Sequence, residues 1–288
     1  MIPSASRPSI ATKFSDFSCF RDGSVGMTGH RGVLGGLLYE RLRANGIAVA
    51  TFDGDVNDTA SLHRWWPARN FRFFFHLAAV VATIRVDADP IRAYETNTIG
   101  AFNICKQALL SEPGCWLFHA SSSHVYRPTP TPTPIVEDAA LEPQTFYGVT
   151  KLAAERLIEP LLQRMSAAYC IGRIFSFSHA TQQEPYLVPS LRKRIAALND
   201  GDTLSVMNPS AVRDIQDADS IIDCILHLAA KRARGIVNIG TGAGTTVREI
   251  AAHLAQELNK RIRIEGADRD APGSLIADTS RLQRLLTE

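Results

Sequence analysis

The segment Gly29-His30-Arg31-Gly32-Val33-Leu34-Gly35 decides how this sequence is read. A weak strand pattern at 24–28 precedes it, and a helical apolar pattern follows it as far as Asn45-Gly46. In such a strand–turn–helix unit, the first glycine allows a tight turn, the second admits a pyrophosphate, and the third lets helix and strand pack closely. The amides at the helix N-terminus favour phosphate. The segment therefore predicts a dinucleotide site that includes Gly29, Arg31, Gly32, Val33 and Gly35.

Strand and helix patterns alternate after this segment. We expect strands at 47–52, 71–77, 116–120 and 168–175, and helices at 58–65, 91–110 and 145–165. Such alternation is typical of a parallel sheet that is covered by helices on both faces. About six strands within the first 175 residues would suit an α/β fold with a Rossmann-type, doubly wound parallel sheet.

The pattern changes after residue 175, and helices at 187–198, 219–231 and 246–258 surround a single strand pattern. We expect a dinucleotide-binding domain at 23–175 and a small, mainly substrate-binding lobe at 176–288. The strand at 235–239 should return from this lobe to the core. Residues 1–22 form an N-terminal extension without a period of 2 or 3.6, and either disorder or a packed arm would fit them.

Composition excludes several classes of protein. The 288 residues carry 31 Lys+Arg and 29 Asp+Glu, and this net charge of +2 is too small to indicate nucleic-acid binding. No apolar run approaches the roughly 20 residues of a membrane helix, and the N-terminus lacks the pattern of a signal peptide. The five cysteines are widely spaced and form no C-x-x-C, which favours free thiols in a reducing compartment. We expect a cytoplasmic protein without a metal, nucleic-acid or membrane partner.

Two residues near the glycine segment point to different cofactors. Asp53 lies 24 residues after Gly29, where a carboxylate can accept both ribose hydroxyls of NAD and repel the 2′-phosphate of NADP. The guanidinium of Arg31 could instead hold that phosphate. Because the carboxylate would make the more direct contact, we expect NAD, with NADP as the alternative.

A second pattern indicates acid–base chemistry. Tyr147 and Lys151 are spaced i, i+4 and would share one face of a helix. A nearby ammonium favours the phenolate, so the pair could exchange a proton at a carbinol or carbonyl oxygen. Ser121-Ser122-Ser123 ends the preceding strand pattern, and a hydroxyl there could bind the same oxygen.

These segments together resemble the extended short-chain dehydrogenase/reductase family, also called the NAD-dependent epimerase/dehydratase family. The resemblance covers roughly residues 24 to 288, and its segments follow one another in the family's order. They are Thr28 to Gly35, Asp55-Val56-Asn57-Asp58, His76-Leu77-Ala78-Ala79, Asn97-Thr98-Ile99-Gly100, Ser121 to Tyr126, Tyr147 with Lys151, Arg213 to Asp217, and Asn238 to Gly242.

The resemblance implies a role for each matching residue. Tyr147 would be the acid/base, Lys151 would hold the nicotinamide ribose and lower the pKa of the tyrosine, and Ser122 would complete the catalytic group. The remaining cofactor contacts would be Asp55 and Val56 at the adenine, Leu77, Ala78 and Ala79 along a strand end, and Asn97 as a structural residue near the cofactor. Ser123, His124 and Arg213 would face the substrate.

Arg213 resembles an arginine that grips the diphosphate of a nucleotide sugar, although a surface ion pair with Asp214 or Asp217 would also explain it. His124 could equally be a structural loop histidine. The resemblance also implies a homodimer formed through the helices near 91–110 and 145–165.

The expected reaction is hydride transfer at C4 of a nucleotide sugar, by a 4-epimerase or a 4-keto reductase. Dehydratases of this family carry acidic residues directly after the serine or threonine, where this chain has Ser123 and His124. That difference makes a dehydratase less favoured. Two other functions remain open: a reductase of a non-nucleotide ketone, which would not need a buried Arg213, and a catalytically inactive NAD(P)-binding regulator, which would typically lack the Tyr147–Lys151 pair.

Overall fold

The computed structural model describes residues 10–66, 70–269 and 273–287. Six parallel strands form its central sheet in the order β10-β5-β4-β3-β1-β2. These strands are β1 (Ser24–Thr28), β2 (Val49–Phe52), β3 (Phe71–His76), β4 (Trp116–Ser122), β5 (Ala168–Ile174) and β10 (Gly235–Ile239). The predicted α/β class and Rossmann-type sheet are confirmed. The expectation of about six strands before residue 176 was wrong for this sheet, because its sixth strand is β10.

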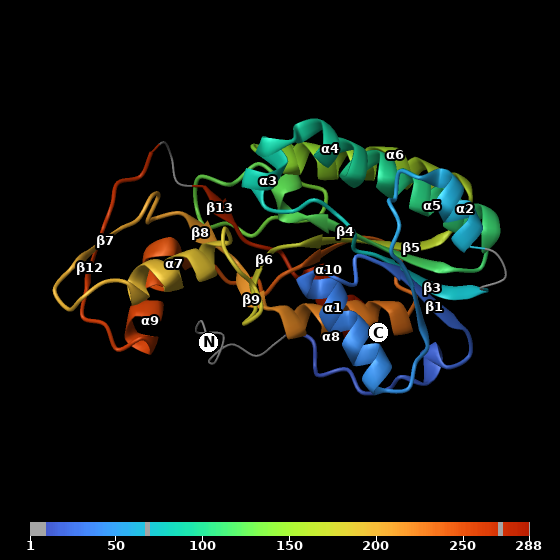
Figure 1. The fold of residues 1–288 in the computed structure, drawn as a ribbon, viewed down its shortest axis with the longest axis horizontal. Coiled ribbons are helices and arrows are strands. Elements are labelled where there is room, and N and C mark those ends of the chain that lie inside the picture. The colour runs from blue at the N-terminus through green and yellow to red at the C-terminus, as the bar shows by residue number, and fades with distance from the viewer. Residues whose placement is uncertain (1–9, 67–69, 270–272, 288) are drawn as a thin grey trace.

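Helices cover both faces of the sheet, as Figure 1 shows. One layer contains α2 (Thr59–Trp65), α3 (Thr83–Ala88), α4 (Pro90–Tyr94), α5 (Ala101–Ser111) and α6 (Phe146–Arg164), and the other contains α1 (Val33–Ala44), α8 (Ala218–Ala230) and α10 (Ser280–Thr287). Sequence analysis did not identify α3 and α10. The predicted helix at 91–110 is interrupted, because a π-helical turn at Glu95–Gly100 separates α4 from α5. The strands are apolar on both sides because both faces are covered.

The N-terminal extension is a packed arm over residues 10–22, of which Ser18–Phe20 form a 3-10 turn. Phe14, Phe17 and Phe20 are all buried, and the ring centroids of Phe20 and Phe73 are 4.7 Å apart. The backbone N–H of Phe14 donates to Oδ1 of Asp223 on α8 at 3.0 Å. The rest of the predicted extension, residues 1–9, lies outside the described residues.

The second lobe packs α7 (Leu187–Ala196) and α9 (Val247–Glu257) against a strand pair, β7 (Thr203–Ser205) and β12 (Arg263–Glu265). Its core is separate from that of the central sheet and includes Leu191, Ile195, Leu204, Ile250 and Leu254. Short strands connect the lobe to the sheet: β6 (Ser176–Ser178) with β9 (Ile215–Asp217), and β8 (Val212–Arg213) with β11 (Thr245–Thr246) and β13 (Ser274–Leu275).

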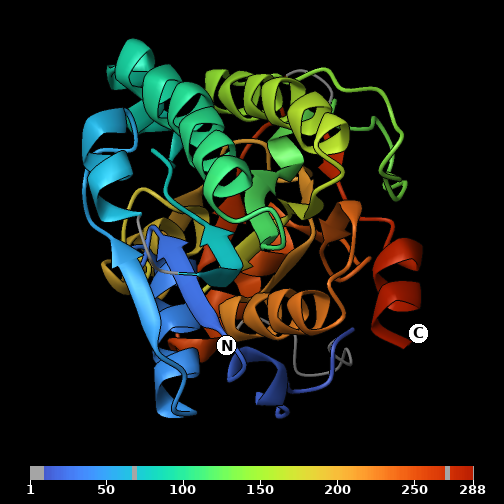
Figure 2. The ribbon, with the colours of Figure 1, turned by 90° about the vertical axis from the view of Figure 1, so that its right-hand side faces the viewer.

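Two further elements of the region 176–288 return to the main body. Helix α8 lies under the central sheet, where Ile221, Ile225 and Leu228 join the core formed with α1. Figure 2 shows α8 beneath the strands and on the side opposite α5 and α6. Strand β10 pairs with β5 at one edge of the central sheet. Residues 176–288 therefore contribute to both the second lobe and the main body.

Candidate active site

The carboxyl ends of β1 and β3 mark the place where the strand order reverses, which is where parallel sheets of this kind bind ligands. Gly29 follows β1 with φ +79°, and a Cβ there would lie 2.5 Å from the backbone nitrogen of Ala78. A Cβ on Gly35 would lie 2.1 Å from the carbonyl oxygen of Gly29. The first glycine is thus needed for the turn, and the third is needed for close packing.

Gly32 is the N-cap of α1, and no side chain of the described residues caps this helix end. The nearest atom to a Cβ on Gly32 would be the Gly29 carbonyl oxygen at 3.3 Å, so this part of the turn is less crowded. Val33 begins the helix beside it. The first amides of α1 therefore form a cradle that fits the phosphates of a dinucleotide.

Arg31 and Asp53, the two residues that predict different cofactors, form an ion pair with each other. Nη2 of Arg31 lies 2.9 Å from Oδ1 of Asp53, and Nε2 of His30 lies 3.3 Å from the same oxygen. The carboxylate is half exposed, at 50%, and the Arg31 side chain is 77% exposed. The carboxylate of Asp53 at the end of β2 is consequently paired with a positive charge. A protonated His30 would place a second positive charge beside the same carboxylate.

Asp55 and Val56 connect the loop after β2 to the helices above it. Asp55 accepts from the N–H of Asn57 at 2.9 Å and from Nη2 of Arg92 at 2.8 Å, and these contacts lower the pKa of its carboxyl. Val56 is buried, and a Cβ on Gly100 would lie 2.3 Å from it. These contacts hold the loop in place.

Asn97 lies in the π-helical turn and holds the loop after β3. Its Oδ1 accepts from the N–H of Val80 at 2.7 Å, and its Nδ2 donates to the carbonyl of Val80 at 2.9 Å and to Oγ1 of Thr150 at 3.0 Å. It thereby ties α6 to the half-buried segment that contains Leu77, Ala78 and Ala79. The structural role predicted for Asn97 fits this geometry.

The structure brings Ser122, Tyr147 and Lys151 together at the end of β4. The hydroxyl of Tyr147 lies near enough to Ser122 for that side chain to lower the pKa of the phenol, and Nζ of Lys151 donates to the carbonyl of Ala120 at 2.9 Å. Helix α6 begins here because Oγ1 of its N-cap, Thr145, accepts from the N–H of Gly148 at 3.1 Å. A proton donor and an ammonium therefore meet at the mouth of the sheet.

Burial dominates the protonation of this pair. It raises the pKa of the Tyr147 phenol well above its ordinary value, and the Ser122 hydrogen bond offsets only part of that rise. Burial also lowers the pKa of Lys151 to about 8, against the opposing charge of Glu155. Nζ of Lys151 lies 6.0 Å from the centroid of the Tyr147 ring, and the lowering of the Tyr147 pKa by Lys151 stays a prediction.

His124 and Arg213 lie on the side of the second lobe. The edge of the His124 ring meets the Tyr147 ring with centroids 5.5 Å apart, and Nδ1 of His124 lies 3.2 Å from Oγ1 of Thr145. Burial first, and then the charge of Arg213, lowers the pKa of His124 to about 4. The imidazole is therefore neutral at physiological pH. Ser123, predicted to face the substrate, is only 2% exposed and offers a substrate little surface.

Arg213 has no carboxylate partner among the described residues. Its Nη1 donates to the carbonyls of Val212 and Gly273 at 2.8 and 2.9 Å, and burial lowers its pKa. Asp214 instead accepts from the N–H groups of Thr241 and Gly242, and Asp217 is the N-cap of α8. The alternative of an ion pair with Asp214 or Asp217 was wrong, because both carboxylates are already used.

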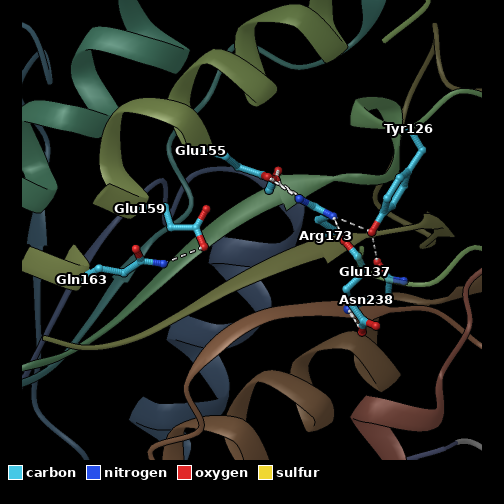
Figure 3. A network of polar contacts seen from close by, with 8 residues as sticks. Tyr126, Glu137, Glu155, Glu159, Gln163, Arg173 and Asn238 are labelled. Atoms are coloured by element: carbon cyan, nitrogen blue, oxygen red, sulfur yellow. Dashed lines mark hydrogen bonds and ion pairs between the residues drawn. The ribbon is translucent and has the colours of Figure 1, made fainter. Parts of the chain in front are cut away.

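Sequence analysis missed a buried polar network beside the catalytic group (Figure 3). Arg173 on β5 pairs with Glu155 on α6, with Nη2 and Oε2 2.7 Å apart, and its Nη1 donates to the hydroxyl of Tyr126 at 2.7 Å. Tyr126 in turn donates to Asn238 at 2.7 Å, and Ser121 donates to Glu155. An arginine in an otherwise apolar strand was the available signal. The network joins β4, β5, β10 and α6.

Tyr186, the N-cap residue of α7, was also missed. It lies near enough to Tyr147 to raise the pKa of that phenol further, although burial has the larger effect. In the described part of the chain, no helix is long and apolar enough to cross a membrane, and no group of three or more potential side-chain ligands could hold a metal ion.

The sequence is similar to those of several known proteins. A family model described as GDP-mannose 4,6 dehydratase matches residues 35–284. A UDP-glucose 4-epimerase of Halalkalibacterium halodurans is 27% identical over 260 residues, which covers 83% of this chain and 77% of the relative. A GDP-6-deoxy-D-mannose reductase of Pseudomonas aeruginosa is 26% identical over 207 residues, covering 70% and 67%.

Solved structures of other proteins have the same fold as this chain. RMD from Pseudomonas aeruginosa, complexed with NADPH, superposes with a TM-score of 0.82 at 22% identity and 92% coverage of both chains. The UDP-glucose 4-epimerase of Thermus thermophilus, complexed with NAD, gives a TM-score of 0.79 at 22% identity, covering 91% and 92%. Because the family model spans most of the sequence, this chain belongs to the GDP-mannose 4,6-dehydratase family within the extended short-chain dehydrogenases/reductases, the NAD-dependent epimerases/dehydratases.

Proposed function

We propose that this chain is an NAD(P)H-dependent 4-keto reductase of a nucleotide sugar. The observation that carries the proposal is the grouping of Tyr147, Ser122 and Lys151 at the end of β4, where the phenol can serve as a proton donor. A reduction needs a proton donor at the carbonyl oxygen, whereas an epimerisation must begin with a base. A nicotinamide cofactor would supply the hydride, and Tyr147 would give its proton to the C4 oxygen.

The glycine cradle supports the cofactor part of this proposal. Gly29, Gly32 and the first turn of α1 would hold the diphosphate, and Lys151 would face the nicotinamide ribose. The pairing of Asp53 with Arg31 and His30 removes much of the repulsion that a bare carboxylate would exert on a 2′-phosphate. We therefore expect the chain to accept NADPH as well as NADH.

The cofactor preference has a direct test. Replacing Arg31 with alanine should leave Asp53 with only His30 beside it and weaken NADPH binding by about tenfold relative to NADH. Asp53→Asn should shift the preference in the opposite direction. Titration of each cofactor by its fluorescence measures both changes, and an unchanged ratio in both variants would show that this pair does not read the ribose.

Arg213 supports a nucleotide-sugar substrate. It is a largely buried guanidinium with no carboxylate partner among the residues described, and its charge reaches His124 beside Tyr147. A diphosphate would give this planar guanidinium the charged acceptor that it lacks. An apolar ketone would leave that charge uncompensated, which makes the non-nucleotide reductase the weaker proposal.

A 4-epimerase is the second candidate, because several relatives are UDP-glucose 4-epimerases and the same three residues would serve that reaction. The deciding experiment offers UDP-, GDP- and dTDP-sugars and their 4-keto forms to the full chain with NADPH or NADH. A reductase consumes one cofactor for each sugar reduced, whereas an epimerase interconverts sugars without net consumption. Cofactor binding without turnover of any of these sugars would instead support an inactive regulator.

We also propose that two copies of the chain pair through α4, α5 and α6. Ile91, Ile99 and Leu157 on these helices and the turn between them are 74%, 40% and 41% exposed, which is unusual for large aliphatic side chains in one layer. Ile91→Asp and Leu157→Asp should yield a monomer in sedimentation velocity if this face is the interface. The five free thiols support the expectation of a reducing, cytoplasmic compartment.

A further inference from the structure

A proline-rich loop lies beside the strands that carry Arg213. This Pro-Thr loop, residues 128–134, reads Pro-Thr-Pro-Thr-Pro-Thr-Pro. The chain on both sides of it enters one small core, because Tyr126 and Ile135 are buried there together with Leu275 of β13. The loop is therefore anchored at both ends, although most of it is exposed.

The loop extends the small sheet that β8 and β13 form. Thr129 exchanges two backbone hydrogen bonds with Ser274, of 2.9 and 2.8 Å, in an antiparallel bridge. On its other edge, β13 pairs with β8, where Leu275 is in register with Arg213. Figure 1 shows β8 and β13 side by side between the central sheet and the second lobe. Strand β13 is thus held between the loop and the strand of Arg213.

Gly273, directly before β13, makes the closest contact with the loop. A Cβ at this position would lie 2.4 Å from Cβ of Pro128 and 3.3 Å from its Cγ. The φ of Gly273 is not positive, so its backbone conformation is open to other residues. Glycine is needed here because Pro128 leaves no space for a side chain.

The carbonyl of Gly273 anchors Arg213. Nη1 of Arg213 donates to this carbonyl at 2.9 Å and to the carbonyl of Val212 at 2.8 Å. Both acceptors are neutral, so they orient the guanidinium without compensating its charge. Nε and Nη2 have no partner among the described residues, and they form an edge of the guanidinium that can bind two oxygens of a phosphate. The direction of that edge depends on where the Gly273 carbonyl lies.

We propose that the Pro-Thr loop positions Arg213 for the diphosphate of the substrate, and that Pro128 does so by fixing the carbonyl of Gly273. This inference rests on the proposed function, in which Arg213 binds the diphosphate of a nucleotide sugar. Pro128 is then a positioning residue, because it acts through Gly273 and Arg213.

The composition of the loop suits this role. Each proline fixes its own φ, has no N–H and restricts the residue before it to extended conformations. Of the N–H groups that remain, that of Thr129 donates to Ser274 and that of Thr133 donates to the carbonyl of Thr131 at 2.7 Å. The loop therefore keeps one shape without a full strand partner. Arg213 is ordered before the substrate binds, which lowers the entropic cost of binding.

The loop acts at a distance from the reacting atoms. The charge of Arg213 reaches His124, whose ring edge meets the Tyr147 ring with centroids 5.5 Å apart. A diphosphate on Arg213 would thus leave the attached sugar beside Tyr147, where the proton is transferred. Because the loop controls the diphosphate end of the substrate, its loss should raise KM much more than it lowers kcat.

Binding of nucleotides to the full chain tests the proposal without turnover. Calorimetric titrations compare GDP with GMP and UDP with UMP, while NADPH saturates the cofactor site so that no nucleotide enters it. In wild type, the second phosphate should increase the affinity by about tenfold or more, and Arg213→Gln should abolish this gain. No gain in wild type, or an undiminished gain in Arg213→Gln, would overturn the positioning role together with the assignment of Arg213 to a diphosphate.

Gly273→Ala tests the loop itself, because the new methyl group must displace either Pro128 or the Gly273 carbonyl. The gain from the second phosphate should fall by about tenfold, while the affinity for NADPH stays within about twofold of wild type. With a 4-keto nucleotide sugar that wild type reduces, KM should rise about tenfold and kcat should stay within about twofold. A merely structural defect would lower kcat at an unchanged KM, which would contradict the proposal.

The matched control is Gly114→Ala, because a Cβ there would meet nothing within 4 Å. This substitution should leave nucleotide binding, KM and kcat within about twofold of wild type. A tenfold rise of KM in this variant as well would mean that the effect of Gly273→Ala is not specific to the loop.

Substitutions of Pro128 distinguish its contact with Gly273 from general damage. In a Pro128→Gly background the nearest atom is gone, so Gly273→Ala should weaken diphosphate binding by less than about twofold. In a Pro128→Ala background that Cβ remains, and the loss should still be about tenfold. Equal losses in the two backgrounds would show that the contact does not position Arg213.

Pro128→Gly alone adds no atoms to the contact and tests the loop even if Gly273→Ala does not fold. Greater freedom of the loop should weaken diphosphate binding by about threefold. A gain that depends on Arg213 but not on Gly273 or Pro128 would overturn the positioning role alone. A wild type that reduces no 4-keto nucleotide sugar, but whose diphosphate binding depends on all three residues, would overturn the reductase function and support the positioning role.

Discussion

The two faces of the central sheet come from the same strands but differ in chemistry. On the face covered by α1, α8 and the N-terminal arm, the buried strand residues are apolar along their length and include Met27, Phe73, Phe75, Trp116 and Phe118. On the face covered by α5 and α6, apolar residues such as Phe74, Leu117 and Ile171 give way to polar ones toward the carboxyl ends of the strands. His76, His119 and Arg173 lie there, together with Lys151 and Glu155.

This difference separates stability from catalysis. One face buries aromatic surface, and the described strand residues in its core carry no charge. The other face buries charged and polar groups at a cost in free energy, and α6, which carries the candidate catalytic residues Tyr147 and Lys151, lies over it. Substitutions on the first face should therefore change the free energy of unfolding with little effect on the rate of each folded molecule, whereas those on the second should change the rate as well.

Tyr147→Phe should have the largest effect. It removes the proton donor, so kcat with a 4-keto nucleotide sugar should fall by about 10²- to 10⁴-fold. The free energy of unfolding should change by only about 1 kcal/mol, the value of one hydrogen bond to Ser122. Steady-state kinetics, cofactor fluorescence and urea unfolding measure the three quantities, and full activity in this variant would disprove the proposed mechanism.

Phe20→Ala tests the apolar face. Loss of a fully buried phenylalanine should lower the free energy of unfolding by about 3–5 kcal/mol. The rate per folded molecule should stay the same, because Phe20 packs on Phe73, near the start of β3, whereas the candidate site lies at the carboxyl ends of the strands. Urea unfolding followed by tryptophan fluorescence gives the first value. Phe20→Leu is the matched control and should cost less than about 1.5 kcal/mol.

Glu155→Gln tests the polar face. Both members of the Glu155–Arg173 pair are 2% exposed, so removal of one charge leaves Arg173 uncompensated and should cost about 3 kcal/mol. Glu155 also raises the pKa of Lys151, so the alkaline limb of the activity profile should move to lower pH. Glu159→Gln, on the same helix but bonded to Gln163 at the surface, should change stability by less than about 0.5 kcal/mol. Equal effects of the two substitutions would mean that burial of the pair is unimportant.

The pH dependence of Lys151 should be the smallest effect. Its folded pKa of about 8 lies below the unfolded value of 10.5, so between these values the unfolded chain binds more protons at this site. The contribution of Lys151 to stability should therefore rise with pH, by about 1.5 kcal/mol between pH 8 and pH 9.5. Activity should fall over the same range as the ammonium is lost. Comparing urea unfolding of wild type and Lys151→Met at both pH values isolates this contribution, which is absent if the two proteins respond equally.

Local patterns in the sequence predicted most of the main sheet. The glycine spacing and the alternation of strand and helix patterns predicted β1 to β5, because each of these patterns is contained in a short stretch of sequence. The π-helical turn was not predictable, since residues 95–100 keep the apolar spacing of a continuous helix. The position of α8 was also missed, because a helix that is apolar around most of its circumference does not indicate which surface it will cover.

The candidate site shows the same limit. Tyr147 and Lys151 were predictable from their spacing and Ser122 from the family resemblance, and the structure brings the three together. The Arg31–Asp53 pair and the His76–His119 stack were not, because both depend on which strands become neighbours. The pKa of Tyr147 also depends on burial, which sequence spacing does not measure.

The N-terminal arm has a consequence for how the protein is made. The N–H of Phe14 bonds to Asp223, 209 residues further along the chain. At a synthesis rate of roughly 5–20 residues per second, the arm leaves the ribosome roughly 10–40 seconds before that partner exists. During this interval its three phenylalanines have no α8 to cover them. The nascent chain should therefore be a client for chaperones that bind exposed aromatic segments until α8 has emerged.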